Sequence, residues 1–312
     1  MTNTATRVLV AFIAIPGILI IAMLGGYYWY ALVLVLGLIG GYEFIALAHR
    51  KGATPQAWVL YPGIVLFITV FIFPRLYHDL LPVTGKAGLP LPSQFQFFTV
   101  LNIALVVMIF WTELFRKSGS ILANIGATMT GLWYLGIFLG TCVGIRELYS
   151  MADFPVGQYF GSIDLGPEQM SRLSLWGGYT LSAVLATIWI CDTAAFFGGK
   201  AMGKRKLCPS VSPKKTWAGA VWGFASAVAA MILFKYTALD YLGLVHALVI
   251  GLIIGSVGQI GDLVESKFKR DAGVKDSSGL IPGHGGVLDR FDSLLFISPV
   301  VYLYLDYVVF AR

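Results

Sequence analysis

Carboxylates and cations are concentrated between residues 261 and 292, in an arrangement that suits a metal ion and phosphate groups. Asp262 stands near the start of this segment, and Asp289 and Asp292 stand three residues apart near its end. Residues three apart share a face of a helix, so these two side chains are predicted to point together. Acidic groups gathered at helix ends suit Mg²⁺, because that ion takes oxygen ligands and keeps waters and substrate phosphates in its shell.

Basic residues in the same segment are predicted to contact phosphate oxygens. Arg does so with a planar fork and Lys as a point charge, and neither can ligate a metal. A basic loop beside a membrane is often only a solvated face, but such a loop needs neither carboxylates nor a histidine framed by glycines. The basic residues concerned are Lys267, Lys269, Arg270, Lys275 and Arg290.

A glycine-rich turn surrounds His284. Gly283, Gly285 and Gly286 allow the backbone to turn sharply and to bring its N–H groups close to an anion. The histidine itself could donate to a phosphate, relay a proton or simply complete the turn, and the sequence leaves these three roles open.

Residues 192–217 hold a second candidate cluster. Asp192 lies in an apolar run, where an ionisable residue is costly enough to be a functional candidate, although a place at a helix end near the interface is the alternative. Ser212 and Thr216 are expected to cap the next helix, with Pro213 in its first turn, so that free amides form an anion site. Two adjacent cations, Lys214 and Lys215, add positive charge there.

The sequence shows no established nucleophile motif. It lacks GxSxG, HExxH and the P-loop pattern GxxxxGK[ST]. Phosphoryl and nucleotidyl transfer need positioning, a metal and charge neutralisation more than covalent help from the protein. The two clusters could therefore act directly on two phosphate substrates.

Glu43 and the three cysteines give weaker signals. Glu43 also lies in an apolar run and could pair with a cation from a neighbouring helix, but its role stays open. Cys142, Cys191 and Cys208 form no CxxC pair, so neither a disulfide framework nor a thiolate zinc site is predicted.

Long apolar runs must position these groups. The chain of 312 residues is 57% hydrophobic and only 12% charged, about half the charge of a soluble domain. Its mean hydropathy of +0.78 excludes disordered and collagen-like chains. A spanning helix needs about 20 apolar residues, and about nine such runs predict an all-α polytopic membrane protein. The runs are Val8–Leu24, Tyr28–Ala48, Ala57–Phe73, Phe97–Phe115, Ile121–Ile145, Leu175–Phe197, Trp217–Phe234, Tyr241–Gly261 and Leu294–Phe310.

The distribution of basic residues predicts the orientation. If the nine runs alternate, 16 of the 22 Lys and Arg residues fall on one side and 6 on the other. The richer side is expected to face the cytoplasm, and both candidate clusters lie on it. We expect residues 1–145 to serve packing, lipid contact and dimerisation, 146–174 to form a non-cytoplasmic loop, and 175–312 to be the catalytic region.

The segment from Ser266 to Asp292 resembles the signature of the CDP-diacylglycerol synthases, also called phosphatidate cytidylyltransferases. That signature reads Ser, Lys-Arg, Lys-Asp, Pro-x-His-Gly-Gly and Asp-Arg-x-Asp, and the chain matches it without a gap. Residues 192–198 and 212–216 also look like segments of this family, so the resemblance covers about the last 120 residues. The matching positions are Ser266, Lys269, Arg270, Lys275, Asp276, Pro282, His284, Gly285, Gly286, Asp289, Arg290 and Asp292.

The resemblance implies a reaction and a set of partners. The phosphate of phosphatidic acid attacks the α-phosphorus of CTP, with Mg²⁺ required, to give CDP-diacylglycerol and pyrophosphate. The family also implies a homodimer, a metal site on Asp262 and Asp289, and room for K⁺ as a second metal. A bacterial inner membrane is the expected location, with the active site facing the cytoplasm, and no nucleic acid is expected as a partner.

Each candidate residue then has an expected role. Asp262 and Asp289 would hold the metal, with Asp192, Asp276 and Asp292 as further ligands or as groups that orient them. The expected phosphate contacts are Lys214, Lys215, Lys267, Lys269, Arg270 and Arg290. The other expected substrate-binding residues are Ser212, Thr216, Ser266, Lys275, His284, Gly285 and Gly286.

Two other functions share some of these features. A transporter for an anionic solute would also have many helices and basic patches, but transporters place ionisable groups near the membrane midplane and often contain repeats, neither of which is found. A CDP-alcohol phosphotransferase also uses membrane-embedded aspartates, but its spaced acidic motif on one helix is missing.

Overall fold

Long apolar helices make up nearly all of the protein, which confirms the predicted all-α membrane architecture. Among the residues described, eight helices are long and apolar enough to cross a bilayer, and Val10–Leu24 is a shorter apolar helix. These nine segments correspond to the nine apolar runs. The computed structural model describes residues 3–84, 92–150, 154–161, 165–281 and 283–311.

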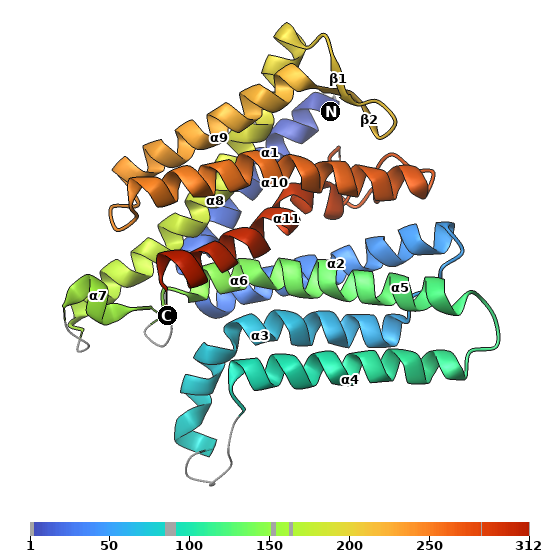
Figure 1. Cartoon of the computed structure of the whole chain (residues 1–312), viewed down its shortest axis with the longest axis horizontal. Coiled ribbons are helices and arrows are strands. Elements are labelled where there is room, and N and C mark those ends of the chain that lie inside the picture. Colours follow the sequence, from blue (N-terminus) through green and yellow to red (C-terminus); the bar gives the residue numbers. More distant parts are fainter. Residues whose placement is uncertain (1–2, 85–91, 151–153, 162–164, 282, 312) are drawn as a thin grey trace.

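From Gly26 to Glu147, the helices form a layer of roughly parallel rods (Figure 1). The last span of the first half is continuous from Ile121 to Glu147 but contains a π-helical stretch in its middle, a feature often found near functional sites. The elements are α1 (Asn3–Leu24), α2 (Gly26–Arg50), α3 (Ala57–Thr84), α4 (Gln94–Leu114), α5 (Ile121–Gly131), η1 (Leu132–Phe138) and α6 (Leu139–Glu147).

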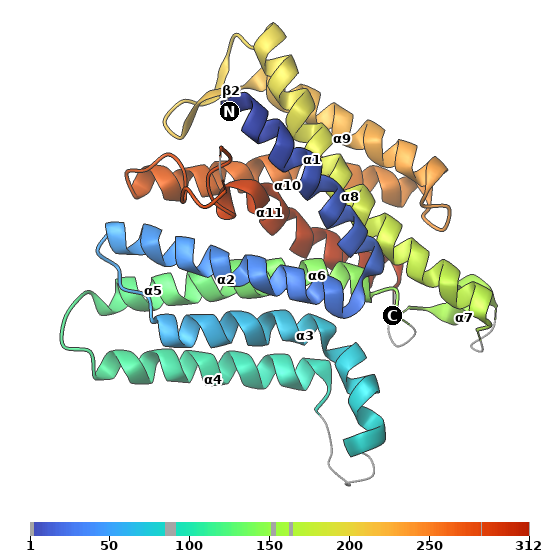
Figure 2. The same ribbon diagram turned by 180° about the vertical axis from the view of Figure 1, so that it is seen from behind.

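In the second half, α8 and α9 run at an angle to this layer, whereas α10 runs roughly along it, and α1 lies along α8 (Figure 2). Within the predicted loop 146–174 the structure places the short helix α7, and α8 begins at Pro167, a residue suited to the first helical turn. The elements are α7 (Val156–Phe160), α8 (Pro167–Met202), β1 (Lys206–Cys208), β2 (Ser212–Thr216), α9 (Trp217–Thr237), α10 (Leu244–Asp271), α11 (Leu288–Tyr304) and η2 (Leu305–Val309).

Glycines allow α8, α9 and α10 to pack closely. On α9, a Cβ atom at Gly219 would lie 2.6 Å from the carbonyl oxygen of Ala195 on α8. On α10, a Cβ atom at Gly255 would lie 2.9 Å from the Cα atom of Phe224 on α9. Small residues at such positions let helix backbones approach each other in a membrane, where no hydrophobic force drives them together. This contact brings the carboxylates of α8 and α10 close together.

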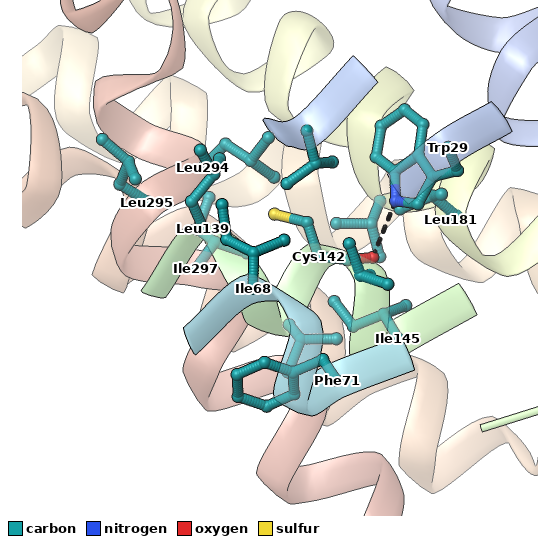
Figure 3. Packing of buried hydrophobic residues seen from close by; sticks show 14 of the residues in the cluster. Trp29, Ile68, Phe71, Leu139, Cys142, Ile145, Leu181, Leu294, Leu295 and Ile297 are labelled. Carbon is teal, nitrogen blue, oxygen red and sulfur yellow. Dashed lines mark hydrogen bonds between the residues drawn. The ribbon is translucent and has the colours of Figure 1, made fainter. Parts of the chain in front are cut away.

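The apolar core joins the two halves (Figure 3). Trp29 of α2 is 2% exposed and donates a hydrogen bond from its Nε1 to the carbonyl oxygen of Cys142 on α6, at 2.9 Å. Ile68 of α3 and Leu295 of α11 are buried in the same cluster. The core therefore fixes α2 in the first half against α11 in the second.

The basic connections gather at one end of the helices. The hairpin β1–β2 and the connections α2–α3, α4–α5 and α10–α11 lie at the same end in both views, whereas α7 and the α9–α10 turn lie at the other (Figures 1 and 2). An ion pair of 3.2 Å between Lys51 and Asp271 joins the ends of α2 and α10 there. The two predicted clusters thus share one end of the molecule.

Candidate active site

A buried lysine links the last turns of α10 to the first turn of α11. The Nζ atom of Lys269 lies 2.6 Å from Oε2 of Glu265, one turn earlier on α10, and also contacts Oδ1 of Asp289. Glu265 is 1% exposed, Lys269 8% and Asp289 7%. Buried charges of this kind persist when they are paired and hydrogen-bonded. α10 thus continues past Asp262, to Asp271.

Asp289 is also held by the loop that precedes α11. Its Oδ2 atom accepts hydrogen bonds from the backbone N–H of Gly286 at 2.7 Å and of Ser277 at 2.8 Å. The hydroxyl of Ser277 lies 2.9 Å from the same oxygen. A carboxylate in the first turn of a helix is further stabilised by the helix dipole. Asp289 is therefore a fixed carboxylate with one oxygen toward Lys269 and the other toward the loop.

Asp262 faces the β-hairpin. Its Oδ2 atom forms an ion pair with Lys215 of β2, and its Oδ1 atom is 3.4 Å from the hydroxyl of Ser266. Both side chains of the pair are partly exposed. In the described chain, each of the two carboxylates expected to hold a metal thus contacts a lysine.

Carboxylates from three helices surround Asp262. Asp192 of α8 and Asp292 of α11 are close enough to Asp262 for their like charges to repel, and Arg290 interacts with Asp192. Asp289 and Asp292 were predicted to point together, but they face different partners, because Asp289 turns back onto its own loop. Within the part of the chain that is described, no three acidic, imidazole or thiol groups meet in ligating geometry. Carboxylate oxygens are nevertheless the type of ligand that a hard cation such as Mg²⁺ takes.

The glycine-rich segment makes the sharp turn that its sequence predicts. Gly283 has φ of 76° and Gly285 has φ of 81°, values that favour glycine. The backbone N–H of His284 donates to the carbonyl of Ile281 at 2.9 Å, while its ring Nδ1 is buried and has no hydrogen-bond partner among the described residues. The histidine therefore completes the turn and keeps an unsatisfied ring nitrogen, and Pro282 lies outside the described residues.

The predicted cap at Ser212 is wrong, whereas the cap at Thr216 is confirmed. Ser212 pairs with Cys208 in the hairpin, which holds residues 212–216 extended, so α9 cannot begin before Trp217. The Oγ1 atom of Thr216 accepts a hydrogen bond from the N–H of Gly219 at 3.2 Å. The hairpin, which the sequence analysis did not foresee, carries Lys215 to Asp262.

Most of the predicted phosphate-binding cations are exposed. Arg270 donates from its Nε atom to the carbonyl of Val211 at 3.3 Å and thereby ties the end of α10 to the hairpin. Asp276 is exposed in the loop before Ser277. The remaining exposed cations are Lys214, Lys267, Lys275 and Arg290.

Glu43 of α2 is a site residue whose role the sequence left open. It is fully buried, and it accepts hydrogen bonds from the N–H groups of Val287 and Leu288, both at 2.9 Å. The hydroxyl of Ser278 lies 2.6 Å from its Oε1 atom. Glu43 thus caps α11, and no cation among the described residues forms an ion pair with it. Its position in an apolar run marked Glu43 as a candidate residue, but that position did not indicate which groups it would bind.

Among the described residues, the arrangement combines carboxylates with exposed cations. Such a site can neutralise and orient phosphates. A family model described as the cytidylyltransferase family matches residues 5–308.

The chain belongs to the cytidylyltransferase family.

Named relatives of this cytidylyltransferase support the assignment and confirm the resemblance seen in the signature. A phosphatidate cytidylyltransferase of Synechocystis sp. is 32% identical over 302 residues, which cover 96% of this chain and 95% of the relative. The phosphatidate cytidylyltransferase of Bacillus subtilis is 33% identical over 218 residues, covering 69% and 73%. That of Haemophilus influenzae is 40% identical over 143 residues, covering 45% and 50%.

Proposed function

We propose that this cytidylyltransferase is a phosphatidate cytidylyltransferase that makes CDP-diacylglycerol. A phosphate oxygen of phosphatidic acid forms a bond to the α-phosphorus of CTP. The bond from that phosphorus to the oxygen bridging to the β-phosphate breaks, and pyrophosphate leaves with the electron pair. The observation that carries the proposal is the meeting of carboxylates from α8, α10 and α11 with the basic hairpin at one end of the helices.

The charged residues of the site would have different roles. Lys214, Lys267, Lys275 and Arg290 are exposed and would neutralise the phosphates of CTP and of the lipid. The buried contacts of Lys269 keep Asp289 in one orientation. Apolar helices around the site would let the lipid enter from the bilayer while CTP enters from water.

The proposed reaction includes a bound metal ion. Asp262 and Asp289 would hold Mg²⁺, with Asp192, Asp276 and Asp292 as further ligands or orienting groups, and with K⁺ as a second metal. Mg²⁺ would offset the negative charge that gathers between the two phosphates. We further propose a homodimer in a bacterial inner membrane with the site facing the cytoplasm, as the basic connections favour.

Purified protein in detergent tests the proposal. CTP labelled in its terminal phosphates is mixed with Mg²⁺, with and without phosphatidic acid. We expect labelled pyrophosphate and CDP-diacylglycerol only when phosphatidic acid is present. Absence of turnover, together with solute flux across proteoliposomes, would instead favour the transporter.

A further inference from the structure

Glu43 and Asp289 hold the same loop from two sides. The amide of Gly286 donates to Asp289, and the next two amides, of Val287 and Leu288, donate to Glu43. The hydroxyl of Ser277 lies 3.0 Å from Glu43 Oε2 and 2.9 Å from Asp289 Oδ2. That hydroxyl has one hydrogen, which the two carboxylates must share, so the position of one carboxylate affects the bond to the other.

The space between the two carboxylates is filled. A Cβ atom at Gly286 would lie 2.1 Å from the Ser277 hydroxyl oxygen and 2.4 Å from Glu43 Oε1. Distances of this size leave no room for the loop to shift without moving Glu43. The loop conformation that aims amides at Asp289 therefore depends on Glu43 staying in place.

Helix α2 gives Glu43 a rigid base. Phe44, the next residue, is 7% exposed, and Leu47, one turn on, is 6% exposed. The ring of Phe44 also packs edge-on against Phe268 of α10, with centroids 6.4 Å apart. α2 thus contacts the helix that carries Lys269 as well as the loop that precedes α11.

Both the charge and the length of Glu43 matter for this contact. Its two oxygens accept hydrogen bonds from the Ser278 hydroxyl and from two amides at the positive end of α11, and they share the Ser277 hydroxyl with Asp289. A glutamine would place an NH₂ donor where donors already point, and would leave buried groups unsatisfied.

We propose that Glu43 is a positioning residue of the transferase, which sets the orientation of Asp289 through Ser277 and the amides of residues 286–288. The inference rests on the proposed function of Asp289. It makes α2, in the half of the chain expected to serve packing, a part of the active site.

Glu43→Gln tests the proposal, with Glu113→Gln as the matched control. Glu113 is also buried in a membrane helix, at 2% exposed, and also accepts side-chain hydrogen bonds, from Gln56 and Asn124. We measure kcat, the KM for CTP and the midpoint of thermal unfolding. Glu43→Gln is expected to lower kcat of the folded protein by about 10- to 100-fold, the cost of a misplacement of about 1 Å, with little change in KM.

The control is expected to lower thermal stability while kcat of the folded protein stays near the wild-type value. A wild-type kcat in Glu43→Gln would overturn the proposal. If Glu43→Gln does not fold, Glu43→Asp replaces it, because that variant keeps the charge but shortens the reach. It is expected to reduce kcat less than the glutamine would, and a wild-type kcat there would overturn the proposal equally.

A binding measurement separates positioning from general stability. Mn²⁺ affinity in the presence of CTP is measured by electron paramagnetic resonance in four proteins: wild type, Glu43→Gln, Asp289→Asn and the double variant. If Glu43 acts through Asp289, Glu43→Gln weakens Mn²⁺ binding in the wild-type background and adds little in the Asp289→Asn background. Additive losses would contradict the proposal. Coupling without any phosphatidate-dependent turnover in wild type would refute the proposed function and leave the positioning role standing.

Discussion

Asp289 is held in place by α10 and by the loop that precedes α11. Lys269, Ser277 and the amide of Gly286 all hold its carboxylate, and it lies at the positive end of α11. These contacts all favour the ionised form, so the carboxylate stays charged and fixed. A group of this kind suits a metal ligand or an electrostatic partner for phosphates better than a proton donor.

Asp289→Asn is expected to reduce phosphatidate-dependent turnover by about 100-fold or more, because a preorganised charge near the reacting phosphates is lost. The control is Asp271→Asn, which removes an exposed carboxylate paired with Lys51 at the end of α10. Initial rates of pyrophosphate release are measured for both variants. Near-normal turnover in Asp289→Asn would remove this residue from the proposed metal site.

Some residues of the site could be predicted from the sequence, and others could not. The signature from Ser266 to Asp292 marks the carboxylates and cations, because their types and spacing are visible in the chain. It does not mark Glu43, whose partners Ser277 and Leu288 lie 234 and 245 positions away. Contacts at such separations depend on how the helices pack, and one sequence carries no record of that packing.

The loop between α10 and α11 acts as a structural element in its own right. It carries three glycines with positive φ, Gly273, Gly283 and Gly285, and an isolated pairing of Ile281 with Gly285 closes its turn. Its packing is uneven, since Gly286 is enclosed, whereas nothing lies within 4 Å of a Cβ atom placed at Gly279.

This difference predicts the outcome of two alanine substitutions. Gly286→Ala is expected to destabilise the protein by about 1 to 3 kcal/mol, the usual cost of overpacking, and to abolish turnover because the Ser277 and Glu43 contacts must move. Gly279→Ala is expected to change neither property. Thermal unfolding and pyrophosphate release are measured for both, and an active, stable Gly286→Ala protein would contradict the described loop.

At the opposite end of the helices, a polar contact fixes the turn between α9 and α10. Asp240 accepts a hydrogen bond from Trp176 Nε1 at 2.6 Å and pairs with Arg172 of α8. Burial raises the pKa of Asp240, but the hydrogen bonds from Arg172 and Trp176 outweigh burial and hold the pKa below its usual value. The folded state therefore favours the ionised carboxylate.

The contribution of Asp240 to stability should be present above the usual pKa of about 3.9 and should be lost as the pH falls through the lower folded pKa. Asp240→Asn is therefore expected to be less stable than wild type near neutral pH, and the difference should shrink in acid. Thermal unfolding is followed from about pH 6 to about pH 3 in detergent. A difference that does not change with pH would show that the ionised carboxylate is not responsible.

The end of one helix and the presence of the β-hairpin also could not be predicted from the sequence. Hydropathy locates the spans, because a bilayer demands apolar length, but it places the end of one run at Phe197, whereas α8 continues to Met202. It also misses the hairpin at Ser212–Thr216, where Pro213 and two lysines give no strand pattern. The hairpin forms by pairing of 206–208 with 212–216 and not by intrinsic strand preference.

In the whole molecule, both halves of the chain contribute to the site, but they contribute different parts. The second half carries the signature, and the first half supplies α2, whose Glu43 reaches the signature loop. The basic connections and the site lie at one end (Figure 1). This asymmetry suits an enzyme that takes a charged nucleotide from water and a lipid from the bilayer.

Sealed membrane vesicles of both orientations test the central claim most directly. CTP does not cross a bilayer, so vesicles that contain phosphatidic acid and receive CTP and Mg²⁺ on the outside report which face carries the site. We predict CDP-diacylglycerol formation in inverted vesicles and, in right-side-out vesicles, only after permeabilisation. Equal synthesis in sealed right-side-out vesicles, or no synthesis in either orientation, would contradict the account.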